Sequence, residues 1–294
     1  MCSSLRECKA THSVAAKPNE ELVSYARISY IGAMITTMQR IVQEAGAIAL
    51  QYHGGLKKND VEFKSEVDLV TKADREIEAY IAGQLKQQFP AVRFVGEESS
   101  AEADYTQGEV FVLDPIDGTT NFVHGLPYFA ISLAYMHDGQ VEAGIVYAPV
   151  LNAMYAAQRG KGAVLNGQSI QASSADQLVN SIAVTGFINL RNRKKPDNIA
   201  TFARAAYEVR SVLRLGSAAI DLCFVADGKI DVFWEHGLNV WDVAAGSLIV
   251  QEAGGVVTAM DGSTHYLSGQ QGILAAGPQL HAAAQNLISE EWGK

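Results

Sequence analysis

The stretch from Asp114 to Thr120 reads Asp-Pro-Ile-Asp-Gly-Thr-Thr, and the rest of the chain is best interpreted outward from it. It follows four apolar, β-favouring residues, Val110 to Leu113, so we expect a buried strand that delivers Asp114 to the edge of a sheet. Pro115 is expected to end that strand, because proline has no N–H to donate to a neighbouring strand. The pattern predicts a ligand site where the strand ends.

The residue types in this stretch suit both a metal ion and a phosphate group. Asp114 and Asp117 offer two carboxylates three residues apart, and the stiff turn at Pro115 lets the Ile116 carbonyl point toward the same cation. Gly118 has no side chain, so the backbone there can approach an anion closely. We therefore expect a site for a hard divalent cation together with a phosphate ester.

Composition and charge narrow the class of protein. The chain has 294 residues, 48% of them hydrophobic and 19% charged, which is enough to bury the core of one large domain or of two coupled lobes. Its formal net charge of −9 argues against binding nucleic acid through phosphates, and the most basic segment, residues 191–195, is expected to be a solvated loop. No uncharged run approaches the length that spans a membrane, so we expect neither a nucleic-acid nor a membrane partner.

The first thirty residues differ from the rest of the chain. They lack the apolar block of a secretory signal, and residues 1–30 are expected to form a flexible N-terminal extension. Residues 31–294 are expected to form one domain with two lobes, about 31–178 and 179–294. Only Cys2, Cys8 and Cys223 occur, too few for a disulfide framework, which suits a reducing, cytoplasmic location.

Hydrophobic periodicity predicts how helices and strands alternate. In the first half the patterns predict a helix from Ile31 to about His53, a second helix ended by Pro90, and strands at 93–95, 110–113, 129–136 and 141–147. In the second half they predict strands at 182–185, 211–215 and 230–234, and helices at 198–207, 218–226 and from Asp242 onward. The fold class is therefore α/β (α+β), a layered sandwich.

Three further segments carry acidic residues, and each has an ordinary structural explanation. Glu97 follows a short strand, and its local sequence taken alone predicts a solvated acidic turn. Asp242 and Asp74 each precede a helix, where an aspartate commonly caps free backbone N–H groups. What favours a functional interpretation is their occurrence together with the Asp114–Thr120 stretch.

In this order, these segments resemble the inositol monophosphatase family. The resemblance runs from about Ile31 to the C-terminus, and it rests chiefly on DPIDGTTNFVHG at residues 114–125 and WDVAAG at residues 241–246. It implies an αβαβα sandwich, a cofactor of Mg²⁺, sensitivity to lithium and a homodimer.

The resemblance also implies roles for individual residues. The implied metal ligands are Glu97, Asp114, the Ile116 carbonyl, Asp117 and Asp242. Thr119 and Asp74 would orient the attacking water, and Glu97 would belong to the same catalytic group. The implied substrate contacts are the backbone amides of Gly118 and Thr119 for the phosphate, and Ala218 and Glu235 for hydroxyl groups.

The implied activity is Mg²⁺-dependent hydrolysis of myo-inositol monophosphate, or of a related polyol phosphate, to the free alcohol and phosphate. Asn239 and the segment Thr185 to Phe187 depart from the animal pattern of the family, which leaves other substrates open. These are histidinol phosphate, fructose 1,6-bisphosphate and a 3′-phosphonucleotide. An alternative from another class is a regulatory binding partner of a macromolecular machine.

Three remaining features favour structural explanations. His236 is expected to be exposed beside Glu235. Gly160 to Gly162 looks only superficially like a phosphate loop and is expected to be a hairpin turn, because no helix opening on a Ser or Thr follows it. Cys223 lies on an apolar helix face and is expected in the core.

Overall fold

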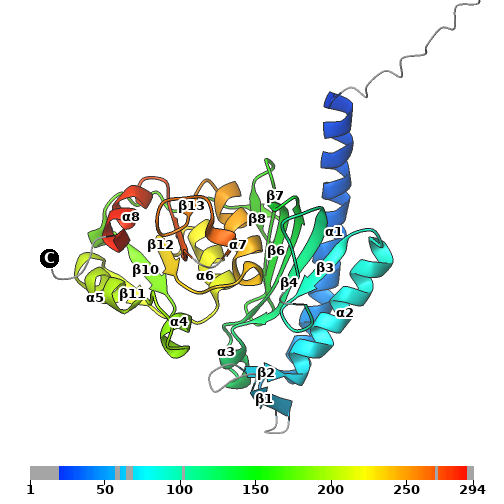
Figure 1. Cartoon of the computed structure of the whole chain (residues 1–294), viewed down its shortest axis with the longest axis horizontal. Helices are drawn as coiled ribbons and strands as arrows, with labels where there is room; N and C mark the ends of the chain where they lie inside the picture. The colour runs from blue at the N-terminus through cyan, green and yellow to red at the C-terminus, as the bar shows by residue number, and fades with distance from the viewer. Residues whose placement is uncertain (1–19, 57–59, 64–68, 101–102, 269–270, 290–294) are drawn as a thin grey trace, which may run out of the picture.

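The computed structural model describes residues 20–56, 60–63, 69–100, 103–268 and 271–289, and for residues 20–28 it describes the backbone alone. Helices and sheets alternate in five layers (Figure 1). This arrangement confirms the predicted αβαβα sandwich. Most of the predicted N-terminal extension, with Cys2 and Cys8, lies outside the described residues.

The first layer is a pair of helices, α1 (Glu20–Tyr52) and α2 (Lys72–Gln88), that covers one face of a seven-stranded sheet. Met38 and Ile41 on α1 are fully buried, as is Ile77 on α2, which accounts for the helical spacing of the apolar residues. Burying each such side chain contributes roughly 1.5–3 kcal/mol. The strands, in spatial order, are β3 (Arg93–Gly96), β4 (Glu109–Asp117), β5 (Ala130–His137), β6 (Gln140–Ala148), β7 (Ala153–Gln158), β8 (Ala163–Leu165) and β9 (Gln168–Ser169).

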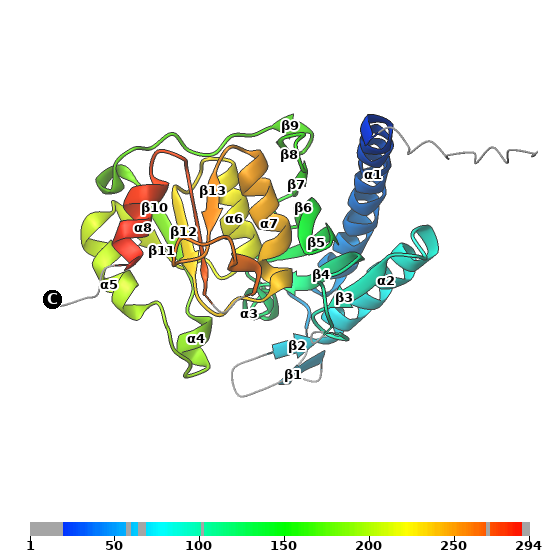
Figure 2. The same ribbon diagram turned by 45° about the horizontal axis from the view of Figure 1, so that its top comes forward.

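The middle layer is formed by α6 (Ala218–Ala226) and α7 (Val240–Glu252), which lie between the two sheets (Figure 2). Both helices are apolar on nearly all sides because each packs against a sheet on two faces. Gly144 on β6 lets α7 come close: a Cβ there would lie 2.9 Å from the Cα of Ala245. This close packing holds α7 against the seven-stranded sheet.

The second sheet has the order β11-β10-β12-β14-β13. Its bounds are β10 (Ile182–Thr185), β11 (Ser211–Leu213), β12 (Val232–Glu235), β13 (Val256–Thr258) and β14 (Ile273–Ala276). The first three strands are parallel, as expected where strands and helices alternate, whereas β14 pairs antiparallel with its neighbours. Helices α5 (Ile199–Glu208) and α8 (His281–Ser289) form the outer layer.

The remaining elements are short. They are β1 (Val61–Phe63), β2 (Leu69–Thr71), α3 (Thr119–Val123), α4 (Ile188–Arg191), η2 (Leu178–Asn180) and η3 (Tyr266–Ser268). The predicted hairpin at Asp138 and Gly139 is confirmed, and both residues have the positive φ that a two-residue turn of this kind requires. Gly160 to Gly162 is also confirmed as a turn, between β7 and β8.

Two predicted boundaries are wrong. Helix α1 begins at Glu20 rather than Ile31, so it includes eleven residues that were assigned to the extension. Strand β4 does not end at Pro115 but continues to Asp117. Its pairing with β5 shifts between Asp114 and Asp117, and this irregularity accommodates the proline, which can occupy a bulge without breaking the strand.

Candidate active site

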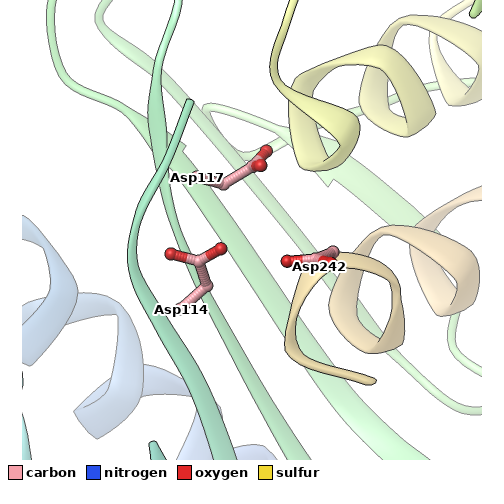
Figure 3. Close-up of side chains that lie close together, drawn as sticks. All are labelled: Asp114, Asp117 and Asp242. Atoms are coloured by element: carbon pink, nitrogen blue, oxygen red, sulfur yellow. The ribbon is translucent and has the colours of Figure 1, made fainter. Parts of the chain in front are cut away.

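Three carboxylates meet where β4 ends. Asp114 and Asp117 come from β4, and Asp242 comes from the first turn of α7, across the gap between the first sheet and the middle layer. One carboxylate oxygen from each of the three lies within 4.8 Å of the other two, and Figure 3 shows the three groups turned toward a common space. The predicted metal ligands Asp114, Asp117 and Asp242 are thus brought together.

The irregular end of β4 sets the direction of its acidic side chains. The N–H of Ile116 donates to Asp114 Oδ1 at 2.9 Å, which fixes that carboxylate from inside its own turn. The hydroxyl of Thr119 donates to the Ile116 carbonyl at 3.0 Å, so the carbonyl is held beside the two aspartates. A carbonyl oxygen has two lone pairs, and one hydrogen bond leaves it able to coordinate a cation.

Asp117 also links the first sheet to the middle layer. Its carboxylate accepts a 2.5 Å hydrogen bond from the Ser217 hydroxyl and a 2.7 Å hydrogen bond from the N–H of Ala219, both at the beginning of α6. Burial raises the pKa of Asp117 to about 6, although these hydrogen bonds oppose the shift. Asp117 therefore ties the first sheet to the beginning of α6 as well as facing Asp114 and Asp242.

Among the described residues, no cation is one of the groups that shift the pKa values of Asp114 and Asp242. Burial raises the pKa of Asp114 well above its ordinary value, and the negative charges of Glu97, Asp117 and Asp242 raise it further. The pKa of Asp242 is raised for the same reasons: burial first, then Asp117 and Glu97. A buried group of oxygen ligands that repel one another fits a hard divalent cation such as Mg²⁺.

Glu97 lies next to this cluster but outside the closest group. It follows β3, which pairs parallel with β4, and its N–H donates to the carbonyl of Leu113 at 3.1 Å. Its effect on the pKa of Asp114 and Asp242 shows that its carboxylate is near theirs. Glu97 therefore borders the same site, as the sequence predicted.

Asp74 and Asp242 occupy equivalent positions in their helices. Neither is the N-cap itself, which corrects the simple capping explanation. The caps are Thr71 and Asn239, and the carboxylate three residues later accepts the backbone N–H of the cap, at 2.8 Å in α2 and 2.6 Å in α7. Each aspartate is held by its cap, and Asp242 also lines the pocket.

Asp74 keeps one carboxylate oxygen available. Its Oδ2 also accepts a 2.5 Å hydrogen bond from the Thr71 hydroxyl, while its buried Oδ1 has no hydrogen-bond partner among the described residues. Burial raises the pKa of Asp74 to about 7, and the charges of Glu98 and Glu97 add to the shift. A carboxylate of this kind suits proton exchange near neutral pH.

A pocket of about 560 Å³ opens beside the cluster. Asp117, Asp242 and Glu97 line it together with Gly118 and Thr119. Gly118 has a φ of 96°, and a Cβ there would lie 3.0 Å from the carbonyls of Gly216 and Tyr128. Glycine is required on both counts, and the backbone at this point is left open to the pocket.

On the second-sheet side the pocket is lined by Glu235, at the end of β12, and by Ala218, the first residue of α6. Glu235 is buried, and its carboxylate accepts the N–H of Ile188 at 3.3 Å. Burial raises its pKa to about 8. A Cβ on Gly186 would lie closer than 3.0 Å to both Glu235 carboxylate oxygens, so this carboxylate occupies the space that any side chain at position 186 would need.

Comparison with known proteins bears on this geometry. The profile of the inositol monophosphatase family matches residues 33–292. The chain belongs to this family. It is accordingly a hydrolase, a phosphatase whose site is built around an acidic cluster able to hold metal.

Individual relatives agree with the family match. The chain is 36% identical over 248 residues to an inositol-1-monophosphatase of Mesorhizobium japonicum, covering 84% of this chain and 92% of the relative. It is 36% identical over 255 residues to a protein named putative Nus factor SuhB from Neisseria meningitidis, covering 87% and 97%. The solved inositol monophosphatase from Anabaena (Nostoc) has a TM-score of 0.80 at 30% identity, covering 89% of this chain and 97% of that one.

One expectation about the pocket surroundings is confirmed and another is wrong. The basic segment 191–195 is exposed, and apart from Arg191 at the end of α4 it lies outside helices and strands, as expected; Arg191 and Lys194 also line the pocket. His236 is half-buried rather than exposed, and its Nδ1 is buried without a hydrogen-bond partner among the described residues. The ring packs on the backbone of Gly272, and burial lowers its pKa. Cys223 is confirmed in the core.

Several residues of the site were missed from the sequence. Ser217 binds Asp117, Gly186 makes room for Glu235, and Arg214 lines the pocket. Ser217 carried a signal, since it stands immediately before a predicted helix, where serine caps, and its hydroxyl does accept the N–H of Ile220. The sequence around Gly186 and Arg214 has no comparable signal, because their roles depend on contacts between separate loops.

Proposed function

We propose that this phosphatase hydrolyses myo-inositol monophosphate, or a related polyol phosphate, in a Mg²⁺-dependent reaction. The observation that supports this most is the meeting of Asp114, Asp117 and Asp242 within 4.8 Å, beside a pocket whose wall includes Gly118 and Thr119. Metal ligands and an anion-accepting backbone on one pocket wall are what a metal-assisted attack on a phosphate ester needs.

In this proposal Asp114, Asp117, Asp242, Glu97 and the Ile116 carbonyl hold Mg²⁺. When bound, the metal neutralises phosphoryl oxygens and the departing alkoxide and makes water more acidic. Asp114 and Asp117 keep their orientation through the Ile116 and Ala219 N–H groups respectively. The chain itself thus holds the ligands in place before any metal binds.

Thr119 and Asp74 are the groups that orient the attacking water. The Thr119 hydroxyl lies against the Ile116 carbonyl, and Asp74 keeps its Oδ1 available, so the two can orient an attacking water by hydrogen bonds. Glu97 belongs to the same group. The backbone N–H groups of Gly118 and Thr119 would bind the phosphate.

The polyol is assigned to the second-sheet side of the pocket. The Glu235 carboxylate is a good acceptor for neighbouring hydroxyl groups, and Ala218 leaves room beside it. Arg191, Lys194 and Arg214 give this side a positive charge that attracts a phosphate ester. A solved relative, the inositol monophosphatase II of Staphylococcus aureus, has been crystallised with inositol monophosphate, at 30% identity and a TM-score of 0.72.

Other parts of the proposal rest on the family alone. They are inhibition by lithium, a homodimer, a cytoplasmic location, and residues 31–294 as a catalytic domain with lobes at about 31–178 and 179–294. Among the helices of the described ranges, none combines the length and the apolar character needed to cross a membrane.

The proposal is tested by phosphate release, with and without Mg²⁺, from a panel of esters. The panel contains both inositol 1-phosphate enantiomers, glycerol 2-phosphate, histidinol phosphate, fructose 1,6-bisphosphate and 3′-phosphoadenosine 5′-phosphate. We expect Mg²⁺-dependent release with a preference for inositol phosphates. Preference for another ester would reassign the substrate. If no phosphate were released from any of them, the proposal that the protein is an enzyme would be contradicted.

A second candidate, a regulatory partner of a macromolecular machine, is favoured by the relatives named Nus factor SuhB. An Asp114→Asn variant separates the two functions. If partner binding is the function, the variant keeps it while hydrolysis is lost.

A further inference from the structure

The turn that carries Glu97 is held by its backbone. The N–H of Gly96 donates to the Ser100 hydroxyl at 2.8 Å, and the N–H of Glu97 donates to the Leu113 carbonyl at 3.1 Å. The N–H of Glu98 donates to Oε2 of Glu78 at 2.9 Å. Each of these three consecutive N–H groups therefore has an acceptor, and the third acceptor is a side chain from another element.

Glu78 lies on α2, one turn after Asp74 and on the same face of the helix, because residues four apart lie above one another. It is only 4% exposed, and it stands between the buried apolar residues Ile77 and Ile81. Burying a carboxylate costs free energy unless its charge is compensated by hydrogen bonds or cations. A residue that served packing alone would be apolar here, so the Glu98 N–H gives a reason for the carboxylate.

Gly96 makes the arrangement possible. A Cβ at this position would lie closer than 3.0 Å to both carboxylate oxygens of Glu78. Gly96 is not among the glycines with a positive φ, so the requirement is one of space rather than of backbone conformation. Gly96 and Glu78 are therefore complementary: the glycine leaves the volume that the carboxylate fills.

We propose that Glu78 is a positioning residue that holds Glu97 beside the metal cluster, with Gly96 as its steric complement. This inference rests on the proposed function, in which Glu97 is a metal ligand. Through Asp74 and Glu78, one face of α2 then supports both the water-orienting group and the outermost metal ligand. Groups that orient metal ligands in this way typically contribute ten- to a hundredfold to metal affinity.

The first test is Mg²⁺ binding measured by calorimetry for the wild type, Glu78→Ala and Glu78→Gln. We expect Glu78→Ala to bind Mg²⁺ about ten- to a hundredfold more weakly. Glu78→Gln keeps an oxygen that accepts the Glu98 N–H and should stay close to the wild type. The matched control is Glu76→Ala, which removes the same charge from the exposed face of the same helix.

The contradicting results are specific. Wild-type Mg²⁺ affinity in folded Glu78→Ala would overturn the inference. So would a Glu78→Gln variant as weak as Glu78→Ala, because charge rather than hydrogen bonding would then be the cause. If the wild type itself bound no Mg²⁺, the proposed function would fail instead, which keeps the two failures apart.

A second pair of variants covers the case in which Glu78→Ala does not fold. Gly96→Ala should displace the Glu78 carboxylate and weaken Mg²⁺ binding about tenfold, whereas Gly83→Ala on α2, where a Cβ meets nothing within 4 Å, should leave binding unchanged. Unchanged binding in Gly96→Ala would contradict the complementarity of the two residues.

Discussion

The buried carboxylates at the two ends of the pocket have different charged surroundings. At the metal end burial raises the pKa of Asp114, Asp117 and Asp242, and neighbouring carboxylates raise the pKa of Asp114 and Asp242 further. No cation of the described residues is among the groups that shift these pKa values. At the substrate end Glu235 is also buried, but it accepts one backbone N–H, and its charged neighbours include the positive Arg214 as well as the negative Asp117. The difference indicates that the first end suits an added cation, whereas at the second end a cation of the protein itself, Arg214, opposes the rise in pKa.

The largest effect is expected from breaking the metal end. Asp114→Asn is nearly isosteric and keeps an oxygen that can accept the Ile116 N–H, so the fold should remain intact. It removes a central ligand charge, and the turnover number for phosphate release should fall roughly a hundred- to a thousandfold or more. Steady-state assays at saturating Mg²⁺, beside a thermal unfolding control, measure this. Near-normal turnover would remove Asp114 from the metal site.

An intermediate effect is expected from breaking the substrate end without touching the metal end. Gly186→Ala should push the Glu235 carboxylate out of place, and a displacement of about 1 Å at such a position can cost up to a hundredfold. We expect KM for inositol 1-phosphate to rise ten- to a hundredfold while Mg²⁺ affinity stays unchanged. Loss of Mg²⁺ binding in this variant would show that the two ends are not separate. Gly83→Ala is the control.

The metal end could be predicted from the sequence because its residues lie in two short signatures. Asp114, Asp117 and Asp242 each stand at a strand end or helix start, where local rules place them correctly. The end of β4 was missed because a bulge lets the strand pass Pro115, and a bulge depends on the partner strand β5. The start of α1 was missed because the predicted helix was begun at the first regular apolar spacing.

The substrate end could not be predicted in the same way. The roles of Gly186 and Arg214 arise from loops that meet only in the folded chain, and a glycine that leaves space for a distant carboxylate has no local signature. Glu78 was missed for a related reason: glutamate in a helix is usually exposed, and nothing local shows that its neighbour is the Glu98 N–H. Sequence patterns specify elements well but specify contacts between elements poorly.

A smaller effect is expected from the basic residues that line the pocket, Arg191, Lys194 and Arg214. Arg214→Gln should raise KM for a phosphate ester about two- to fivefold, because a partly exposed charge contributes little free energy. The increase should shrink at high salt, where the charge is screened in the wild type as well. Arg210→Gln is the matched control, since Arg210 is exposed and binds Asn180 rather than lining the pocket. An equal change in both variants would show a general charge effect.

The smallest effect concerns pH and stability at Glu235. Burial raises its pKa from 4.5 to about 8, so between these values the folded protein holds a proton that the unfolded chain releases. The contribution of Glu235 to the free energy of unfolding is therefore full below the pKa that this residue has in the unfolded chain. It is lost as the pH rises through about 8. Glu235→Gln cannot titrate, and between about pH 5 and pH 9 its Tm should fall by a few degrees less than that of the wild type. Parallel Tm profiles would contradict the raised pKa.

The central claim is that the carboxylates at the end of β4 and the start of α7 form a divalent metal site. The most direct measurement is a crystal structure determined with Mn²⁺ in place of Mg²⁺, using anomalous scattering to locate the metal. We predict anomalous peaks between Asp114, Asp117 and Asp242, at about 2.0–2.3 Å from their carboxylate oxygens. Crystals that contain Mn²⁺ but show no peak among these three residues would contradict it.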